Sequence, residues 1–369
     1  MKICIVTHST NRFGRHYVRS FRERGHEVIS LLLDGEKESF CGSQAIPLRR
    51  AFAAGKTNSR FPYIRLVLPV RRAIKAIRPD IVFALYLSSA GVIACLSGAP
   101  HVIVSARGGD VNTHIHSRLW RLIFRWQANR SDLIHTVSQP LLDTLRNQVG
   151  IRESQLCVCP IGVDADLFAW IDPARRPNAG RIICTRAHAP VYNHLTLIRA
   201  ITELKRRGIL CHVTFASCTG DVQATRRLVE KYDVGDIVTF LSGYEQCELS
   251  DLLANADVYV SCSLSDGTSS SLLEAMSTGT FPIVSDIVAN RPWIQDGKNG
   301  VLFRPQDDTD LANHLEDALQ KPDIRVQAGK GSRAIVLKRG QKNQNMDCLL
   351  SAFERCLTQG ANTSFPDKQ

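Results

Sequence analysis

The chain has 369 residues, of which 44% are hydrophobic and 22% charged, as expected of a soluble globular protein with about two domains. It contains no apolar run of about 18 residues, and its first residues lack the longer apolar region of a signal peptide, so neither a membrane span nor a secretory leader is expected. Its 12 cysteines are scattered without a Cys-x-x-Cys pair, which favours reduced thiols and a cytoplasmic location.

The net charge of +11 is unevenly distributed, because residues 1–80 contain 16 Lys and Arg residues against 6 Asp and Glu residues. Such a surface attracts anionic phospholipid or a lipid diphosphate, although a merely solvated basic face fits as well. Nucleic acid is not an expected partner, because the basic residues are not interleaved with aromatic ones and no known binding motif is present. A peripheral position on the inner face of a membrane is therefore compatible with the sequence.

The sequence pattern of residues 1–168 predicts a first domain in which strands and helices alternate. Its predicted strands are Lys2–His8, Glu27–Leu33, Asp80–Tyr86, His101–Ala106, Asp132–Val137 and Leu156–Pro160. Helices are predicted near residues 14–25, 60–77, 88–97, 116–129 and 139–148. This alternation indicates a parallel, doubly wound α/β sheet, whose ligands bind beyond the carboxyl ends of the strands. The turn after the first strand has one glycine, and without a G-x-G-x-x-G a dinucleotide cofactor is not expected.

Two short motifs of this domain have residue types that bind metals. His114 and His116 form a His-x-His, but no third ligand is nearby in the sequence. Asp164 and Asp166 form an Asp-x-Asp after a Pro-Ile-Gly turn at the end of the domain, and we interpret them as structural. The sequence therefore predicts no metal site.

A linker at residues 172–180, rich in proline, glycine and charge, precedes a second domain at residues 181–335. Its predicted strands are Arg181–Thr185, Cys211–Ala216, Ile237–Leu241, Val258–Cys262 and Pro282–Ser285. Its predicted helices lie near residues 194–207, 221–232, 246–254, 269–278 and 309–320. Residues 336–358 depart from this alternation and contain an amphipathic helix at Met346–Leu357.

The segment Ser263–Met276 leads from an apolar strand through a polar turn into a helix. Gly267 permits unusual backbone angles, and Thr268 and the three serines that follow it, Ser269, Ser270 and Ser271, are good N-cap residues. The N–H groups at such a helix start lie at the positive end of the helix dipole and bind anions, most often phosphate. The segment is therefore a candidate phosphate site.

Asp266 and Glu274 lie eight positions apart, one in this turn and the other in the helix, where carboxylates can accept hydrogen bonds from sugar hydroxyls. This pattern resembles the Glu-x7-Glu signature of retaining family 4 glycosyltransferases (glycosyl transferases group 1), which have the GT-B fold. The alternative interpretation is an ordinary capped helix with two solvated acids. Such a helix would not require the family pattern to continue beyond its end, but the match continues through Gly279–Asp286 and Trp293–Phe303. The resemblance implies two doubly wound Rossmann-like domains facing across a cleft. The first would bind the acceptor and the second the nucleotide-sugar, with the helix at residues 336–358 returning to the first.

By this resemblance, Glu274 holds the ribose of a nucleotide-sugar, and Asp266, one methylene shorter than the family's glutamate, contacts the donor sugar. The backbone of the turn between them faces the sugar and the diphosphate. Arg186 matches the family's arginine that pairs with the donor phosphates, and a surface salt bridge is the alternative. Most relatives have a lysine about six residues later, where this chain has Tyr192 and Asn193.

The resemblance also implies roles for three residues of the first domain. Gly14 lies in a turn that is glycine-rich in the family and lets the diphosphate approach the backbone, although an ordinary helix-start residue fits as well. Arg107 replaces a histidine of many relatives; it is always protonated, so it can stabilise the leaving diphosphate but cannot act as a general base. Asp110 resembles the aspartate of the family's Gly-x-Asp segment and would bind an acceptor hydroxyl, or else cap the next helix.

The sequence therefore predicts a glycosyltransferase of the hexosyltransferase type that moves a sugar, with retention, from a nucleotide-diphosphate sugar to a hydroxyl acceptor. A lipid-linked or cell-surface glycan is the expected acceptor, as in polysaccharide or lipopolysaccharide biosynthesis. The nucleotide-sugar is a co-substrate, and no metal or cofactor is expected, because Arg186 and the helix start can stabilise the leaving diphosphate. Two other functions remain open: a GT-B nucleotide-sugar epimerase and a non-catalytic GT-B partner subunit.

Overall fold

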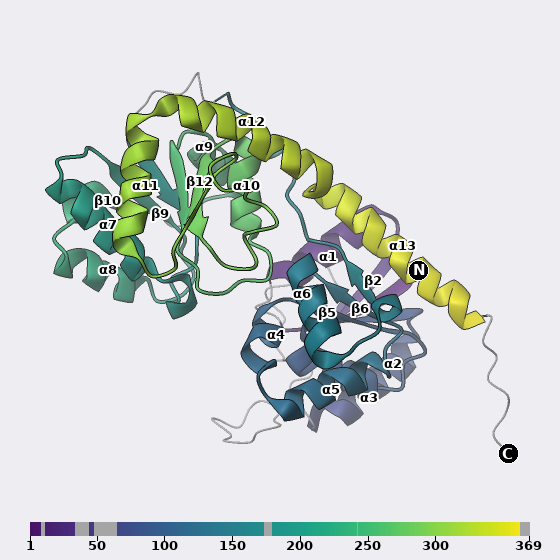
Figure 1. Ribbon diagram of the computed structural model, residues 1–369. Coiled ribbons are helices and arrows are strands. Elements are labelled where there is room, and N and C mark those ends of the chain that lie inside the picture. Colours follow the sequence, from purple (N-terminus) through teal and green to yellow (C-terminus); the bar gives the residue numbers. More distant parts are fainter. Residues whose placement is uncertain (9–11, 34–43, 48–64, 173–178, 242, 362–369) are drawn as a thin grey trace, which may run out of the picture. The chain divides into compact units, whose positions relative to one another are not determined.

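Two parallel β-sheets organise the chain, and each belongs to a separate unit (Figure 1). The computed structural model describes residues 1–8, 12–33, 44–47, 65–172, 179–241 and 243–361. The first unit contains residues 1–160 and the chain from Met346 onward, and the second contains Ile161–Asn345. The boundary lies earlier than the predicted residue 168, because Val163 exchanges backbone hydrogen bonds with Gly340 and Lys342.

The first sheet holds seven strands in the order β3-β2-β1-β4-β5-β6-β7, and every neighbouring pair is parallel. The strands are β1 (Lys2–Thr7), β2 (Glu27–Leu32), β3 (Gln44–Pro47), β4 (Ile81–Leu85), β5 (Val102–Ala106), β6 (Leu133–Thr136) and β7 (Leu156–Val158). This order confirms the predicted doubly wound α/β class. The short strand β3 was not predicted.

The helices of the first unit are α1 (Arg12–Glu23), α2 (Val67–Ile77), α3 (Gly91–Leu96), α4 (Gly109–His114), α5 (Arg118–Ala128) and α6 (Gln139–Thr144). Two helices predicted at 88–97 and 139–148 are partly π-helical, at Tyr86–Ala90 and Leu145–Val149. Buried aliphatic side chains join α2, α3 and α5 to one face of the sheet. Phe83 points to the opposite face, because successive strand residues alternate, and there its ring contacts those of Tyr17 and Phe21.

The second sheet holds six parallel strands in the order β10-β9-β8-β11-β12-β13. They are β8 (Arg181–Cys184), β9 (His212–Ala216), β10 (Val238–Leu241), β11 (Val258–Ser261), β12 (Phe281–Ser285) and β13 (Val301–Phe303). The first five were predicted to within one or two residues at each end. The three-residue strand β13 was not predicted.

The helices of the second unit are α7 (His194–Arg206), α8 (Val222–Lys231), α9 (Gln246–Ala254), α10 (Ser270–Thr278), α11 (Asp308–Gln320) and α12 (Pro322–Arg339). The sequence did not predict α12, because Gly329 and Gly331 weaken its helical pattern. An ion pair holds this helix instead: the guanidinium of Arg325 lies 3.2 Å from the carboxylate of Asp257, and both side chains are buried. The same arginine donates to the carbonyl of Ala318, so α12 is tied to both β11 and α11.

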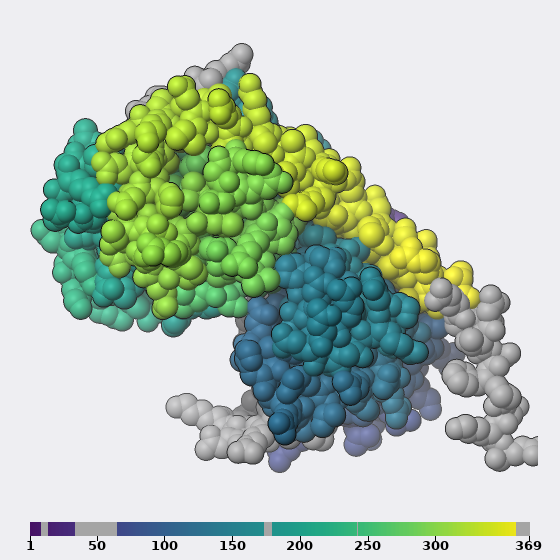
Figure 2. All heavy atoms as spheres, viewed as in Figure 1, coloured from purple at the N-terminus to yellow at the C-terminus, as the bar shows by residue number. Residues whose placement is uncertain are grey.

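The last helix, α13 (Lys342–Ala361), contains the predicted amphipathic segment, and from Met346 it belongs to the first unit. Phe353 packs against Phe21 and Phe83, with ring centroids 5.7 and 5.2 Å apart. Asp347 forms an ion pair of 2.6 Å with Arg24 of the same unit. The space-filling view shows the yellow helix against the blue side chains of this unit (Figure 2). None of the described helices is long and apolar enough to cross a membrane.

Candidate functional site

The second sheet reverses its strand order at β8, which lies between β9 and β11. Open α/β sheets bind their ligands beyond the carboxyl ends of the strands at such a point. Arg186 follows β8, and the turn Ser263–Ser269 follows β11. Because β8 and β11 are paired, these two segments leave the sheet side by side.

The helix after this turn begins and ends as its sequence predicts. Ser269 is the N-cap of α10, and its hydroxyl oxygen accepts a hydrogen bond of 3.2 Å from the N–H of Leu272. Gly279 ends the helix in the left-handed conformation (φ 82°), and the ring of Trp170 fills the space where a Cβ atom would lie. Buried apolar side chains hold the helix between these ends: Leu272, Leu273, Ala275 and Met276.

The guanidinium of Arg186 lies at the start of α10 and makes three side-chain hydrogen bonds. Its Nη1 donates to the Oγ atoms of Ser269 (2.8 Å) and Ser271 (3.0 Å), and its Nη2 donates to Oδ2 of Asp266 (2.6 Å). The side chain of Arg186 is 9% exposed and that of Asp266 is 18% exposed. The structure therefore brings Arg186, Asp266 and Ser269, all predicted site residues, into one group with Ser271. We call these four residues the Arg186 cluster.

Two tyrosines support the Arg186 cluster. The Tyr192 ring lies 4.1 Å from Cζ of Arg186, in a cation–π contact. The Tyr259 hydroxyl lies 2.9 Å from Oγ of Ser271. Burial raises the pKa of Tyr259 to about 12, so this hydroxyl stays neutral near pH 7. Both contacts orient the polar groups of the cluster without adding negative charge.

The charge of Arg186 is maintained although the side chain is buried. Burial, the largest single effect, would lower the pKa of its guanidinium, but the Asp266 carboxylate together with Tyr259, Tyr192 and Cys184 outweighs burial, and the pKa is raised above its usual value. The first intrahelical N–H bond of α10 runs from Leu273 to Ser269, so the amides of Ser270 and Ser271 precede it. A fixed cation next to these amides and to the positive end of the helix dipole suits a polyanion such as a diphosphate.

The loop that carries Arg186 is fastened to the loop after β9. Nδ1 of His188 lies 2.8 Å from Oγ1 of Thr225, and Nε2 lies 3.0 Å from the carbonyl oxygen of Ser217. Gly220 (φ 89°) passes so close to His188 that a Cβ atom would collide with the His188 carbonyl oxygen. Only glycine fits at this position without a shift of the loop.

The other predicted residues of the second unit extend the site along the helix start. Gly267 is buried, and its N–H donates to Oδ1 of Asp266 (2.8 Å). Thr268 is half-buried just before the helix. Glu274 is half-buried too, and it lies on the same face of α10 as Ser270, four residues earlier. The contiguous positions fit a ligand that runs from the Arg186 cluster towards Glu274.

Arg107 and Asp110 lie in the first unit, at the turn between β5 and α4. Both are buried, and Nη1 of Arg107 donates to the hydroxyl of Tyr17 at 2.8 Å. Asp110 accepts the N–H groups of Arg107 and Gly108 on Oδ1 and that of Leu87 on Oδ2. Burial raises the pKa of Asp110. This geometry favours a structural role for Asp110, close to the predicted capping alternative: it holds the turn that carries Arg107.

Gly14 lies within the first turn of α1 and is buried, as an ordinary helix-start residue would be, while residues 9–11 of its turn lie outside the described residues. The His114 ring stacks on Trp120, with ring centroids 4.3 Å apart. Oδ1 of Asp164 accepts the N–H of Leu167, which fits its structural interpretation. Across the described parts of the chain, no group of three or more His, Cys, Asp or Glu side chains is arranged to hold a metal ion.

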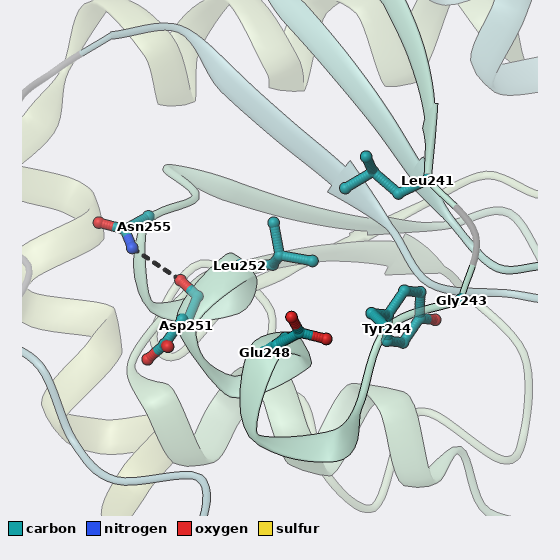
Figure 3. A pocket seen from close by; sticks show the side chains of 7 residues that line it. All are labelled: Leu241, Gly243, Tyr244, Glu248, Asp251, Leu252 and Asn255. Carbon is teal, nitrogen blue, oxygen red and sulfur yellow. Dashed lines mark hydrogen bonds between the residues drawn. The ribbon is translucent and has the colours of Figure 1, made fainter.

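A pocket of about 440 Å³ lies elsewhere in the second unit, between the end of β10 and α9 (Figure 3). It is lined by Leu241, Gly243, Tyr244, Glu248, Asp251, Leu252 and Asn255. Its two carboxylates make this pocket unsuitable for a diphosphate, so the Arg186 cluster is the better phosphate site.

Sequence reasoning missed two side-chain contacts of Arg186, those with the Ser271 hydroxyl and the Tyr192 ring. The sequence predicts Ser271 as an N-cap and backbone N–H candidate, whereas in the structure its hydroxyl accepts a hydrogen bond from Arg186. The signal for Ser271 was its spacing: it stands two residues after the N-cap Ser269, and the two hydroxyls lie 3.1 Å apart. Tyr192 was noted as a missing lysine, but the alternative, an aromatic ring stacked on Arg186, was not considered.

Replacing Ser269 by alanine should lower the free energy of unfolding of the second unit by about 1 kcal/mol, because the N-cap bond of α10 is lost. Urea unfolding followed by circular dichroism measures this. Ser269→Thr keeps the hydroxyl and should retain most of the stability. Equal destabilisation by both substitutions would show that tight packing, and not the N-cap bond, stabilises this position.

Comparison with known proteins identifies the family of the chain. Residues 10–167 match the profile of Glycosyltransferase Family 4, and residues 173–335 match that of Glycosyl transferases group 1. The MMP alpha-(1->4)-mannosyltransferase of Mycolicibacterium hassiacum is 30% identical over 60% of this chain and 56% of its own length. The sulfoquinovosyl transferase of Arabidopsis thaliana is 28% identical over 88% of this chain and 66% of its own length. The matches thus span less than two thirds of either relative.

Solved structures show the same architecture. Sucrose-phosphate synthase from Thermosynechococcus elongatus is 17% identical, with a TM-score of 0.80 over 97% of this chain and all of its own. HepE from Anabaena, in complex with UDP, is 16% identical, with a TM-score of 0.77 over 96% of this chain and all of its own. Both solved structures share the GT-B arrangement of two parallel α/β units with this chain. By its matches to the two family profiles, the chain belongs to the glycosyltransferases of group 1, family 4, as its Asp266–Glu274 pattern indicated.

Proposed function

We propose that this enzyme transfers a sugar from a nucleotide-diphosphate sugar to a hydroxyl acceptor, with retention at the anomeric carbon. The observation that supports this most directly is the Arg186 cluster, a buried guanidinium fixed at the start of α10. The bond between the anomeric carbon and the phosphate oxygen breaks, and a bond to the acceptor oxygen forms on the same face of the sugar. The leaving phosphate takes the acceptor's proton.

In this mechanism Arg186 and the amides of Ser270 and Ser271 stabilise the negative charge that grows on the leaving diphosphate. They perform the task that a divalent cation performs in other enzymes, so we propose that transfer needs no metal. Asp266 and the turn at Gly267 and Thr268 contact the donor sugar.

UDP is the first candidate nucleotide, because it is the ligand in the HepE complex. A lipid-linked or cell-surface glycan is the proposed acceptor, with the enzyme at the inner face of the membrane and a role in polysaccharide or lipopolysaccharide assembly. The names of two relatives, a mannosyltransferase and a sulfoquinovosyl transferase, support transfer of a sugar group.

A thermal-shift screen with UDP, GDP and ADP and their sugars tests the proposal. One nucleoside diphosphate should raise the melting temperature, and transfer assays with its sugars should then proceed in EDTA. Product analysis separates transfer from epimerisation, because an epimerase consumes the donor without an acceptor. Failure of every nucleoside diphosphate to bind would refute the proposal, and loss of transfer in EDTA would refute its metal-free form.

Glu274 is proposed to accept hydrogen bonds from the ribose hydroxyls. Glu274→Ala should therefore weaken UDP binding about tenfold or more, which corresponds to the free energy of hydrogen bonds to a charged group. Calorimetry with UDP and 2′,3′-dideoxy-UDP isolates the contact: the wild type should prefer UDP, and the variant should bind both equally. A variant that still prefers UDP to the same degree would place the ribose elsewhere.

A further inference from the structure

The outer surface of α2, α3 and α5 differs from the rest of the first unit. All four exposed large apolar side chains among the described residues of this unit lie on these three helices: Leu68 (64% exposed), Leu96 (41%), Leu119 (56%) and Leu122 (61%). The helices cover the same face of the first sheet, and α3 contacts both α2 and α5 (Figure 1). We call this surface the α2–α5 face.

The same three helices contain no Asp or Glu residue. α2 carries Arg71, Arg72 and Lys75, all exposed, and α5 carries three further arginines. Among the described residues, no ion pair joins the cations of α2 to a carboxylate, whereas the nearby acids Asp143 and Glu153 are both paired with Arg146. The α2–α5 face therefore combines exposed leucines with uncompensated positive charge.

We propose that the α2–α5 face docks on an anionic lipid bilayer. Leucines on the outer side of a helix layer can enter the region between head groups and acyl chains, while long cationic side chains remain among the lipid phosphates. Each cation near an anionic membrane adds to the affinity, and only a negatively charged partner complements a face with no acid. A bilayer fits this pattern because it offers an extended layer of negative head groups directly beside an apolar layer, as the neighbouring cations and leucines of this face require.

The spacing on α5 supports this orientation. Leu119 and Leu122 lie three residues apart and hence on one side of the helix, and Arg118 and Arg121 precede each of them. On the opposite side, Phe124 and Ala128 are buried in the core of the first unit. One side of α5 thus holds the fold together, and the other has no partner within the described part of the chain.

This inference does not depend on the sugar-transfer reaction, and sedimentation with lipid vesicles tests it on the full chain. The wild type should bind vesicles of phosphatidylcholine with about one-third phosphatidylglycerol and should bind pure phosphatidylcholine far more weakly. Replacing Arg71, Arg72 and Lys75 by glutamine should lower the partition coefficient about 100-fold. The double substitution Leu119→Asp with Leu122→Asp should lower the partition coefficient at least about tenfold. This loss should persist in high salt, where the charges of the cations are screened.

The second unit offers a matched control. Replacing Arg226, Arg227 and Lys231 of α8 by glutamine removes the same number of exposed cations and should change vesicle binding little. An equal loss in both triple variants would overturn the proposal, because net charge alone would then explain binding. A lipid-free dimer that the leucine substitutions dissociate would also overturn it. Nucleotide-induced thermal shifts should persist in every variant, so failure of docking is distinguishable from failure of the proposed catalysis.

Discussion

Replacing Arg186 by alanine is expected to lower kcat/KM for sugar transfer by about 100- to 1,000-fold, as removal of one preorganised donor does at other anion-stabilising sites. The guanidinium is buried, fixed by Ser269, Ser271 and Asp266, and stacked on Tyr192. It therefore needs little reorganisation as charge develops on the diphosphate. Steady-state kinetics and UDP calorimetry should show turnover and affinity falling together.

Arg186→Lys separates charge from geometry. Lysine keeps the positive charge but cannot bind two hydroxyls and a carboxylate with one planar group, so activity should fall between those of the wild type and the alanine variant. Arg226 is the matched control, because it too stacks on an aromatic ring, with Cζ 4.3 Å from the centroid of Phe240. Arg226→Ala should leave kcat/KM unchanged. Normal turnover in Arg186→Ala, with a correctly folded variant, would remove Arg186 from the mechanism.

The start of α10 could be predicted from the sequence because its determinants are local. The N-cap serine, the apolar residues within the helix and the terminal Gly279 lie within eleven consecutive positions, and each acts on its immediate neighbours. The parallel sheets were predictable for a related reason: buried strands appear as short apolar runs separated by helical patterns. The presence of these elements was therefore predictable, and their ends shifted by a residue or two.

The contacts that complete the site could not be predicted in the same way. Arg186 and Asp266 are eighty positions apart, and their bond depends on the pairing of β8 with β11. The stacking of Tyr192 on Arg186 depends on the path of one loop, which His188 and Gly220 fix through contacts with the loop after β9. Helix α12 has a weak local pattern because of Gly329 and Gly331, and the Arg325–Asp257 ion pair that holds it joins distant segments, so it too could not be predicted.

The pairing of Arg186 with Asp266 also changes the interpretation of Asp266. The resemblance implied a carboxylate that contacts only the donor sugar. In the structure its Oδ2 accepts from the guanidinium at 2.6 Å, and its Oδ1 accepts from Gly267. A diphosphate that binds Arg186 must share the guanidinium with this carboxylate and tolerate its negative charge. We therefore expect the charge of Asp266 to oppose nucleotide binding, whatever the carboxylate contributes to the proposed contact with the donor sugar.

Asp266→Asn should consequently separate nucleotide affinity from catalysis. The substitution removes one negative charge from the phosphate site and keeps the shape of the side chain, so UDP should bind up to about tenfold more tightly. Transfer should fall about 100-fold, because the amide is a poorer acceptor for the donor's hydroxyls. Calorimetry with UDP and initial rates with the sugar donor measure the two effects separately.

A matched control is the ion pair between Arg207 and Glu316, which are 2.7 Å apart and partly exposed in the same unit. Glu316→Gln removes a carboxylate from an arginine at a distance from β8 and β11, so it should alter neither UDP affinity nor transfer. If Asp266→Asn instead weakens UDP binding as much as Arg186→Ala, the carboxylate is required to position the guanidinium. The charge competition inferred from the 2.6 Å contact would then be wrong.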